Sequence, residues 1–231
     1  MKNKRLGKRL LSVSSMVRRG AVLADIGTDH AYLPIYLLKE GIISRAVCSD
    51  INEGPLASAE ENLKEEGLLD SAELYLTCGA AALAGKGITD YAICGMGGEL
   101  IADIIESAPA LKENGVRLIL QPMTKPELLR KYLASHGFDI ITEKFSFDEG
   151  KYYVALCCEY SGTVREISEL EAYFGVLASG EISDSAMIGY LKGRTQALEK
   201  IINGKRQAGV DFSDEQALVD GLSRKVTFKA T

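Results

Sequence analysis

The stretch "LADIGTDHAYLPIYLL", residues 23–38, predicts a buried strand that passes through a short polar loop into a helix. The apolar run ends in an aspartate, one glycine follows, and Thr28, Asp29 and His30 lead into a second apolar segment. Open α/β sheets bind ligands beyond the carboxyl ends of their strands. Two aspartates and one of only two histidines at this position therefore indicate a binding site.

The chain around this stretch has the pattern of an α/β sheet. Strand–helix alternation over residues 20–136 predicts a parallel sheet with helices on both faces. Residues 138–160 then resemble an antiparallel hairpin with a tight turn at 148–150. Alternating units closed by a hairpin are typical of the seven-stranded methyltransferase sheet, so we expect an α/β, Rossmann-like domain over residues 1–160. The expected strands are 21–26, 45–51, 72–79, 90–95 and 116–122, the last ended by Pro122, then 138–147 and 151–160, and the expected helices are 31–41, 54–67, 98–111 and 125–137.

Residues 161–231 show a different pattern, with little strand signal. Amphipathic helices are expected at 166–177, 185–204 and 214–228. Leu191, Leu198 and Ile202 are spaced i, i+7 and i+11, on one face of a helix. We therefore expect a second domain, a C-terminal α-helical coiled-coil appendage, whose role is either scaffold packing or direct ligand contact.

The composition limits the class of protein. The chain has 231 residues, 46% of them hydrophobic, which suits one medium-sized domain with an appendage. No apolar run approaches the roughly 20 residues of a membrane-spanning helix, and the basic N-terminus is a poor signal peptide. Five cysteines without C-x-x-C spacing and only two histidines disfavour a zinc site. We expect a cytoplasmic protein that binds neither a metal nor a membrane.

Charge is unevenly distributed along the chain. The net charge is −5, yet residues 1–20 contain seven Lys and Arg and no acid, so the remainder carries −12. This asymmetry indicates either a local anionic partner such as RNA or a solvated basic arm. Arg5, Lys8 and Arg9 recur at helical spacing and are candidates for phosphate contacts. Basic residues of the tail form a second candidate surface: Lys192, Arg194, Lys200, Lys205 and Arg206.

The ends of the first two expected strands suit S-adenosylmethionine (SAM). The pattern G-x-G-x-x-G is absent, since only Gly27 follows the first strand, and this disfavours NAD and FAD. Asp25 beside Gly27 suits an amino-acid ligand, because a carboxylate accepts hydrogen bonds from an α-ammonium group. Asp50, followed by Ile51, ends the next strand, where an acid typically accepts hydrogen bonds from ribose hydroxyls. These four residues are our first candidates for cofactor binding.

The third and fourth expected strands end in small residues. Gly79 and Ala80 would let backbone N–H groups meet an adenine. Gly95 and Met96 would lie beside the reacting centre, with Met96 as an apolar wall, and Gly97 is a candidate for the pocket of a substrate base. The alternative for these glycines is an ordinary strand–helix turn. In combination with the first two strands, the pattern favours the site.

Several segments together resemble the bacterial tRNA (adenine-22-N1)-methyltransferase family. The resemblance covers residues 5–160 and implies SAM-dependent methylation of N1 of adenine 22 in tRNA. It also implies a Rossmann-like N-terminal domain and a C-terminal coiled coil. The chain departs from the expected pattern at "GAA" (79–81), where a more polar "GDG"-like or "GNG"-like piece is expected, so only backbone contacts are expected there. The segments are "RLGKRL", "DIGTDHAYLP", "SDIN", "CGMGGELI", "LQPMTKPELLRKYL", "GF" and "EGKYYVAL".

The chemistry of this reaction suggests roles for the remaining candidates. N1 of neutral adenine carries a lone pair, so the enzyme mainly orients the two reactants. Asp29 either accepts from the N6 amino group and favours the developing cation, or caps the following helix. His30 either orients Asp29 or the tRNA, or is satisfied locally. Arg9 is the basic residue that we expect nearest the target, and Gln121 and Pro122 are expected to line the base pocket.

Two other functions remain possible from the sequence. A SAM-dependent enzyme could act on another RNA or a small molecule, or the protein could bind SAM without catalysis. A nicotinamide-dependent oxidoreductase is disfavoured by the lone glycine after the first strand. We expect a monomer that binds tRNA.

Overall fold

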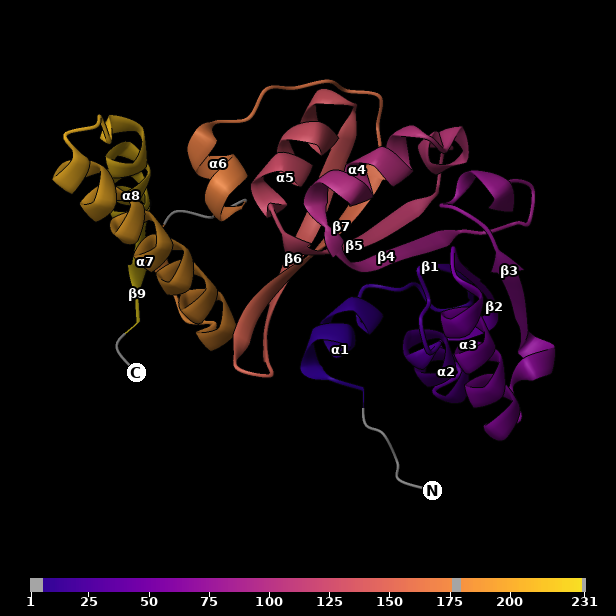
Figure 1. Ribbon diagram of the computed structural model, residues 1–231. Coiled ribbons are helices and arrows are strands. Elements are labelled where there is room, and N and C mark those ends of the chain that lie inside the picture. The colour runs from indigo at the N-terminus through magenta and orange to yellow at the C-terminus, as the bar shows by residue number, and fades with distance from the viewer. Residues whose placement is uncertain (1–5, 176–179, 230–231) are drawn as a thin grey trace.

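The computed structural model describes residues 6–175 and 180–229, and its centre is a seven-stranded sheet in the order β3-β2-β1-β4-β5-β7-β6 (Figure 1). Neighbouring strands from β3 to β5 pair in parallel, whereas β7 pairs antiparallel with both β5 and β6. This arrangement confirms the predicted α/β, Rossmann-like fold. The strands are β1 (Ala21–Ile26), β2 (Ile43–Asp50), β3 (Ala72–Leu76), β4 (Asp90–Gly97), β5 (Arg117–Thr124), β6 (Phe138–Asp148) and β7 (Lys151–Tyr160).

Helices cover both faces of the sheet (Figure 1). Helices α1, α2 and α3 pack on one face, against Leu23 of β1 and Ala92 of β4. Helices α4 and α5 pack on the other face, against Ile93 and Leu118. Successive residues of β4 thus enter opposite cores, as expected for a strand that is buried on both faces. The helices are α1 (Lys8–Ser14), α2 (Tyr32–Lys39), α3 (Glu53–Glu65), α4 (Gly98–Glu106) and α5 (Pro126–Ser135).

Several predicted boundaries differ from the structure by a few residues, and a proline lies at two of them. Strand β5 continues past Pro122 to Thr124, because Pro122 pairs with Met96 where the register of β4 shifts. At such a bulge the missing N–H of proline breaks no regular ladder bond. The helix predicted over 98–111 ends at Glu106, and a 3-10 turn follows at Pro109–Lys112.

The C-terminal part adds three helices and a small second sheet. Strand β8 (Gly180–Ile182) pairs in parallel with β9 (Val226–Phe228), which the sequence did not predict. The helix predicted over 214–228 therefore ends at Lys225, where β9 begins. The sequence analysis missed β9 because a strand of three residues is too short to show a periodicity. The helix predicted over 166–177 is shortened, and its last two residues lie outside the described residues. The helices are α6 (Glu169–Phe174), α7 (Ser185–Ala208) and α8 (Ser213–Lys225).

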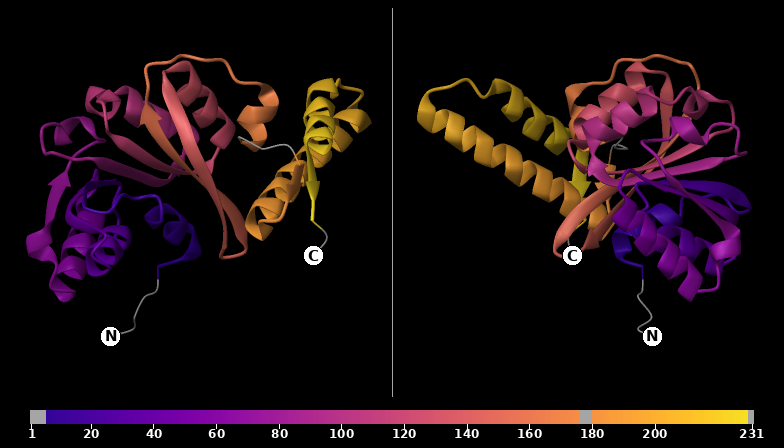
Figure 2. Two further views of the ribbon diagram at one scale, coloured as in Figure 1. Left: turned by 180° about the vertical axis from the view of Figure 1, so that it is seen from behind. Right: turned by 45° about the vertical axis from the view of Figure 1, so that its right-hand side comes forward.

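Helices α7 and α8 lie side by side as an arm attached to the β6–β7 edge (Figure 2). Leu191, Leu198 and Ile202 are buried on one face of α7, as their spacing predicts. They belong to a core that includes Leu222 of α8 and Val154 of β7. The helical appendage is therefore confirmed, and coiled-coil packing within it stays a prediction.

Strands β6 and β7 extend beyond their pairing with β5. The last β5–β7 pair is Leu120 with Leu156, which also pairs with Glu143 of β6. Five residues of each strand, 144–148 and 151–155, lie beyond that point, about 16 Å of chain at 3.3 Å per residue. We call residues 144–155 the ribbon. Because β6 runs parallel to β5, the ribbon lies at the same edge as the carboxyl ends of the parallel strands, between α1 and α7 (Figure 1).

Candidate functional site

The loop between β1 and α2 exposes Asp29 at the carboxyl edge of the sheet. The N–H groups of Gly27 and Thr28 both donate to the carbonyl oxygen of Ser49, at 2.8 and 2.9 Å, and hold the loop on β2. Asp29 and Ala31 have φ angles of 50° and 55°, which residues with a side chain rarely adopt. The Asp29 side chain is nevertheless 68% exposed. Strained backbone that presents an open carboxylate is typical of a functional position.

Asp29 does not cap the helix that follows it. The N-cap residue of α2 is Ala31, and the start of this helix has no side-chain cap hydrogen bond. His30 Nε2 lies 3.6 Å from Asp29 Oδ1, and its ring stacks on Tyr32 with the ring centres 5.1 Å apart. Of the two roles considered for Asp29, the structure does not show the capping role, and ligand contact, with His30 orienting the carboxylate, stays a prediction.

Asp25, at the end of β1, is a buried carboxylate. The residue is 6% exposed, and its Oδ2 accepts from Thr28 Oγ1 at 2.7 Å. Burial raises the pKa of Asp25 to about 6, with a further contribution from the charge of Asp50, although the Thr28 hydrogen bond opposes this. Within residues 6–175 and 180–229, no Lys, Arg or His forms an ion pair with Asp25. Such a group favours a positively charged ligand, which replaces the solvation lost on burial.

The end of β2 combines an acid with an apolar surface. Asp50 Oδ1 accepts from the N–H of Asn52 at 2.9 Å, and the residue is 9% exposed. Ile51 beside it and Leu76 at the end of β3 are 65% and 52% exposed. A carboxylate next to exposed apolar side chains suits a flat ring joined to a hydroxylated sugar.

The loop after β4 meets the loop after β1 through Met96. A Cβ at Gly27 would collide with Met96 Cε, so the methionine side chain lies against this glycine. Gly95 is exposed, and a Cβ at Gly97 would lie 3.2 Å from Thr124 Oγ1 at the end of β5. The ends of β1, β4 and β5 therefore converge around Met96.

Gly79 and Ala80 follow β3 at the same edge but offer only backbone to a ligand. The Ala80 side chain is fully buried in the core beneath α4. A Cβ at Gly79 would lie 3.8 Å from Ile104 of that helix. Neither position has a side chain that could reach an adenine, which agrees with the departure noted in the sequence.

Helix α1 brings Arg9 to the end of β5. Its Nη1 donates to Gln121 Oε1 at 2.5 Å, and its guanidinium carbon lies 5.9 Å from the ring centre of Tyr153. Gln121 pairs with Cys94 in the carboxyl half of β4. Arg9 therefore lies at the carboxyl ends of the parallel strands, where Asp25 also lies in β1.

The structure places the other predicted substrate residues in different ways. Gln121 and Pro122 are buried, Gln121 accepts from Arg9, and their place in a base pocket stays a prediction. Lys8 is exposed at the start of α1. Arg5 lies outside the described residues.

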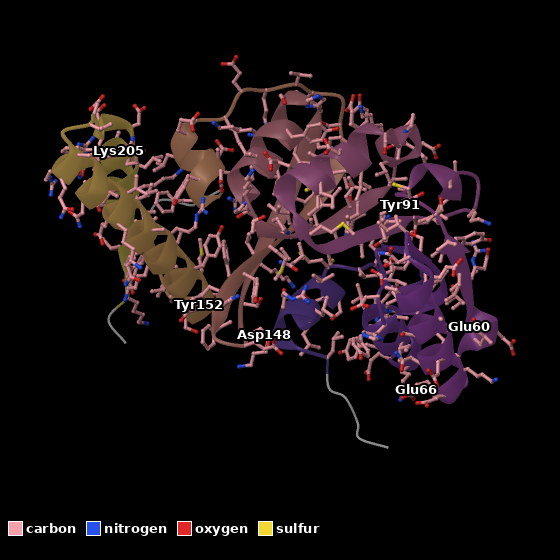
Figure 3. All side chains as sticks on the ribbon, in the orientation of Figure 1. Glu60, Glu66, Tyr91, Asp148, Tyr152 and Lys205 are labelled. Carbon is pink, nitrogen blue, oxygen red and sulfur yellow. The ribbon has the colours of Figure 1, made fainter. Side chains whose placement is uncertain are left out.

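Two cations of the predicted tail surface are used within the chain. Arg194 Nη2 donates to Glu127 Oε2 at 2.7 Å, and the Arg194 guanidinium lies 3.6 Å from the ring centre of Tyr173. Lys205, labelled in Figure 3, pairs with Glu215 at 2.7 Å. Both cations thus pair with carboxylates of α5 and α8, and an RNA contact of this surface stays a prediction.

Sequence reasoning missed two residues of the ribbon. Asp148 Oδ2 accepts from the backbone N–H of Arg9 at 3.1 Å, and Tyr153 lies near the Arg9 guanidinium. Tyr153 lies in "EGKYYVAL", one of the segments that carry the resemblance, and this was a usable signal. The sequence carries no local signal for Asp148, whose partner is 139 residues away.

The residues present fit SAM. The buried carboxylate of Asp25 can accept from an ammonium group, Asp50 lies beside exposed apolar side chains, and Met96 is flanked by glycines in the chain and contacts Gly27. Among the described residues, no three His, Cys, Asp or Glu side chains gather so that they could hold a metal ion. No helix in the described part of the chain is long and apolar enough to cross a membrane.

The fold and this site define a methyltransferase of the seven-stranded α/β class, and a family model described as "Methyltransferase domain" matches residues 6–156. The tRNA (adenine(22)-N(1))-methyltransferase of Bacillus subtilis is 32% identical over 200 residues, which are 86% of this chain and 84% of the relative. The chain belongs to the tRNA (adenine(22)-N(1))-methyltransferase family, which confirms the resemblance seen in the sequence.

Solved structures agree with this family. The Streptococcus pneumoniae protein Sp1610 in complex with S-adenosyl-L-methionine is 32% identical, with a TM-score of 0.80 over 94% of this chain and 99% of that one. TrmK of M. capricolum in complex with S-adenosyl-homocysteine is 28% identical, with a TM-score of 0.76 over 93% and 95% of the two chains. Structures of relatives thus contain SAM or its demethylated product.

Proposed function

We propose that this protein methylates N1 of adenine 22 in tRNA, with SAM as the methyl donor. The observation that carries the proposal is the pairing of two unlike aspartates at one strand end. Asp25 is buried without a cation from the described residues, and Asp29, four residues further along the chain, is exposed on strained backbone. The names of the relatives supply the position in tRNA.

The cofactor side of the site consists of the strand ends that lie around Met96. SAM, when bound, supplies a methyl group on a positively charged sulfur. In this proposal the Asp25 carboxylate accepts from the α-ammonium group, and Asp50 accepts from the ribose hydroxyls. Ile51 contacts the adenine ring, with backbone groups of Gly79 and Ala80 at its edge. Gly95 and Met96 border the space beside the sulfur.

The acceptor side consists of Asp29 and its neighbours. N1 of neutral adenine reacts through its lone pair and needs no base, so proximity and alignment are the main contributions. Positive charge develops on the adenine ring as the methyl group transfers. Asp29 accepts from the N6 amino group and stabilises that charge, while His30, 3.6 Å away, orients the carboxylate. Gly97 leaves room for the base.

The tRNA side consists of α1. N1 lies on the Watson–Crick edge, so the target base must leave any pairing before it reacts. Lys8 and Arg5 supply phosphate contacts, and Arg9 lies closest to the base, backed by Gln121 and Pro122. We also propose a monomer that acts in the cytoplasm, where a tRNA substrate is found, with residues 1–160 as the SAM-binding domain and 161–231 as the helical domain.

Methyl transfer from labelled SAM to unmodified bulk tRNA tests the proposal. Nucleoside analysis of the product should show N1-methyladenosine. The signal should vanish on a tRNA transcript with adenine 22 replaced, and should persist when another adenine of the same arm is replaced. SAM binding without transfer to any tRNA would instead support a non-catalytic protein or a different acceptor.

A further inference from the structure

Helix α1 carries Arg9 but, among residues 6–14, has no side-chain cap from its own segment. Its N-cap residue is Gly7, and its first turn contains no acid. The acceptor comes from Asp148, whose Oδ2 accepts from the N–H of Arg9 at 3.1 Å. The two segments are in direct contact, since a Cβ at Gly7 would overlap the Asp148 carboxylate. A carboxylate at this position accepts from an otherwise free N–H group and interacts favourably with the positive end of the helix dipole.

The face of the ribbon that carries Asp148 is directed at α1. Lys144, Asp148 and Tyr153 share this face, because alternate residues of paired strands point the same way. Lys144 Nζ donates to Ser15 Oγ at 2.7 Å, at the far end of α1. The ribbon therefore contacts both ends of this short helix.

The opposite face of the ribbon is directed at α7. Phe145 lies 5.1 Å from Tyr190, measured between ring centres. A Cβ at Gly189 would collide with the ring of Tyr152, so this aromatic packs closely on the helix. Figure 3 shows Asp148 on the α1 side of the ribbon tip and Tyr152 on the α7 side. Packing on α7 makes the ribbon a firm support for whatever Asp148 holds.

Arg9 is consequently held at both of its ends. The backbone N–H is bound by Asp148, and the guanidinium is bound by Gln121 at 2.5 Å. Gln121 is buried and fixed in turn, since its Nε2 donates to the carbonyl oxygen of Pro122 at 2.9 Å. With the backbone fixed, the long arginine side chain has fewer conformations to lose when it meets a substrate.

We propose that Asp148 is a positioning residue for methyl transfer, which acts by capping α1 and so holding Arg9 against Gln121 at the substrate side of the site. The inference rests on the proposed function in one respect, because it assigns Arg9 to the tRNA side. Asp148 itself does not touch substrate or cofactor. Its effect passes through Arg9.

A double-mutant cycle tests this coupling in the full chain. Arg9→Ala should lower kcat/KM for tRNA by roughly 10- to 100-fold, as expected for loss of a charged hydrogen bond. Asp148→Ala should lower it by about tenfold with SAM affinity unchanged. The double variant should have the same kcat/KM as Arg9→Ala alone, because Asp148 acts only by positioning Arg9. Losses that multiply in the double variant would overturn the proposal.

Two further variants separate positioning from general stability. Asp148→Asn should retain most of the activity, because asparagine caps helices about as well as aspartate. Asp139→Ala is the matched control, a half-buried aspartate at the other end of the same strand, and should leave kcat/KM unchanged. Rates should be expressed per SAM-binding site, so that any unfolded fraction is removed. An Asp148→Asn variant as inactive as Asp148→Ala, or equal losses in Asp139→Ala, would contradict a capping role.

Hydrogen exchange gives a readout that needs no tRNA. The amide of Arg9 should exchange slowly in the natural protein and at least tenfold faster in Asp148→Ala, together with the rest of residues 8–14. Unchanged exchange would overturn the proposal even if tRNA methylation is confirmed. Faster exchange with no methylation of any tRNA would keep the capping role of Asp148 and reject the proposed function instead.

Discussion

Two buried aspartates, one at the amino ends and one at the carboxyl ends of the parallel strands, differ in whether a cation is paired with them. Asp90, at the amino end of β4, is fully buried, and its carboxylate accepts from Arg18 through the backbone N–H, Nε and Nη2, at 2.9, 2.8 and 2.6 Å. Asp25, at the carboxyl end of β1, is almost as buried, yet in the part of the chain that the structure describes its side chain is bonded to the hydroxyl of Thr28.

The difference fits two roles: the charge of Asp90 stabilises the fold through Arg18, and the charge of Asp25 is proposed to bind a ligand. Asp90 has its cation within the fold, so the pair ties the segment before β1 to β4. Asp25 has no such cation among the described residues, and its raised pKa of about 6 reflects the unfavourable burial of the charged form. A ligand that brings a positive group would relieve this cost.

The largest expected effect is on the paired aspartate. Arg18→Met leaves the Asp90 carboxylate buried without its cation, and we expect the free energy of unfolding to fall by about 3–5 kcal/mol. Urea denaturation measures this change. SAM affinity of the folded fraction should stay within twofold. A loss of SAM affinity with normal stability would contradict a purely structural role of the Arg18–Asp90 pair.

The second effect is on catalysis at the carboxyl edge. Asp29→Asn removes the charge while keeping a residue that tolerates positive φ. We expect kcat to fall by about 100-fold, the size of effect seen when one group that stabilises a transition state is removed, with SAM affinity unchanged. Single-turnover methylation measures the rate, and Asp70→Asn, an exposed aspartate in the turn before β3, is the control. Loss of SAM binding in Asp29→Asn would make the residue structural.

The third effect is on the unpaired aspartate itself. Asp25→Asn should weaken SAM binding by roughly 10- to 100-fold, since a hydrogen bond to a charged group is lost. The free energy of unfolding of the cofactor-free protein at pH 7 should rise, because the variant buries no charge. Titration calorimetry and urea denaturation check the two parts, and a protein that loses stability together with SAM would show Asp25 to resemble Asp90.

The smallest effect is a pH dependence that follows from the same group. The folded protein holds the Asp25 proton more tightly than the unfolded chain, whose carboxyl has a pKa of 3.8. The contribution of Asp25 to the free energy of unfolding of the cofactor-free protein should therefore fall as pH rises from about 4 to 6 and then level off, and it is measured as the difference between the natural protein and Asp25→Asn. SAM binding needs the charged form, so affinity should rise about tenfold per pH unit below about 6 and be flat above it. Asp25→Asn should abolish this dependence.

Much of the site was predictable because it follows a rule of sheet topology. Asp25, Asp50 and Met96 end neighbouring parallel strands, and parallel strands end at one edge, so their proximity follows once the strands are recognised. The contact between Met96 and Gly27 is the spatial counterpart of that expectation. The helix ends near glycines and the hairpin turn were also predictable, because the preference of turn residues for their conformation is local.

Contacts between distant segments were not predictable in this way. Arg9 and Gln121 are 112 residues apart, and Arg9 and Asp148 are 139 apart. Three further features depend on which surfaces pack together: the burial of Gln121, the ion pair between Arg194 and Glu127, and the pairing of β8 with β9. Basic residues in a sequence all look like candidates for RNA, and only their neighbours show which are already neutralised.

The sequence by itself determined the family, the order of strands and helices in residues 20–160, and the acids that mark the strand ends. Those properties follow from short-range periodicity, turn residues and motifs of a few positions. The tertiary structure decided that Asp90 pairs with a cation while Asp25 has none among the described residues, that Asp29 is exposed on strained backbone, and that the distant ribbon binds the backbone of Arg9. Charge compensation and helix capping between segments depend on three-dimensional packing, which no local pattern of residues specifies.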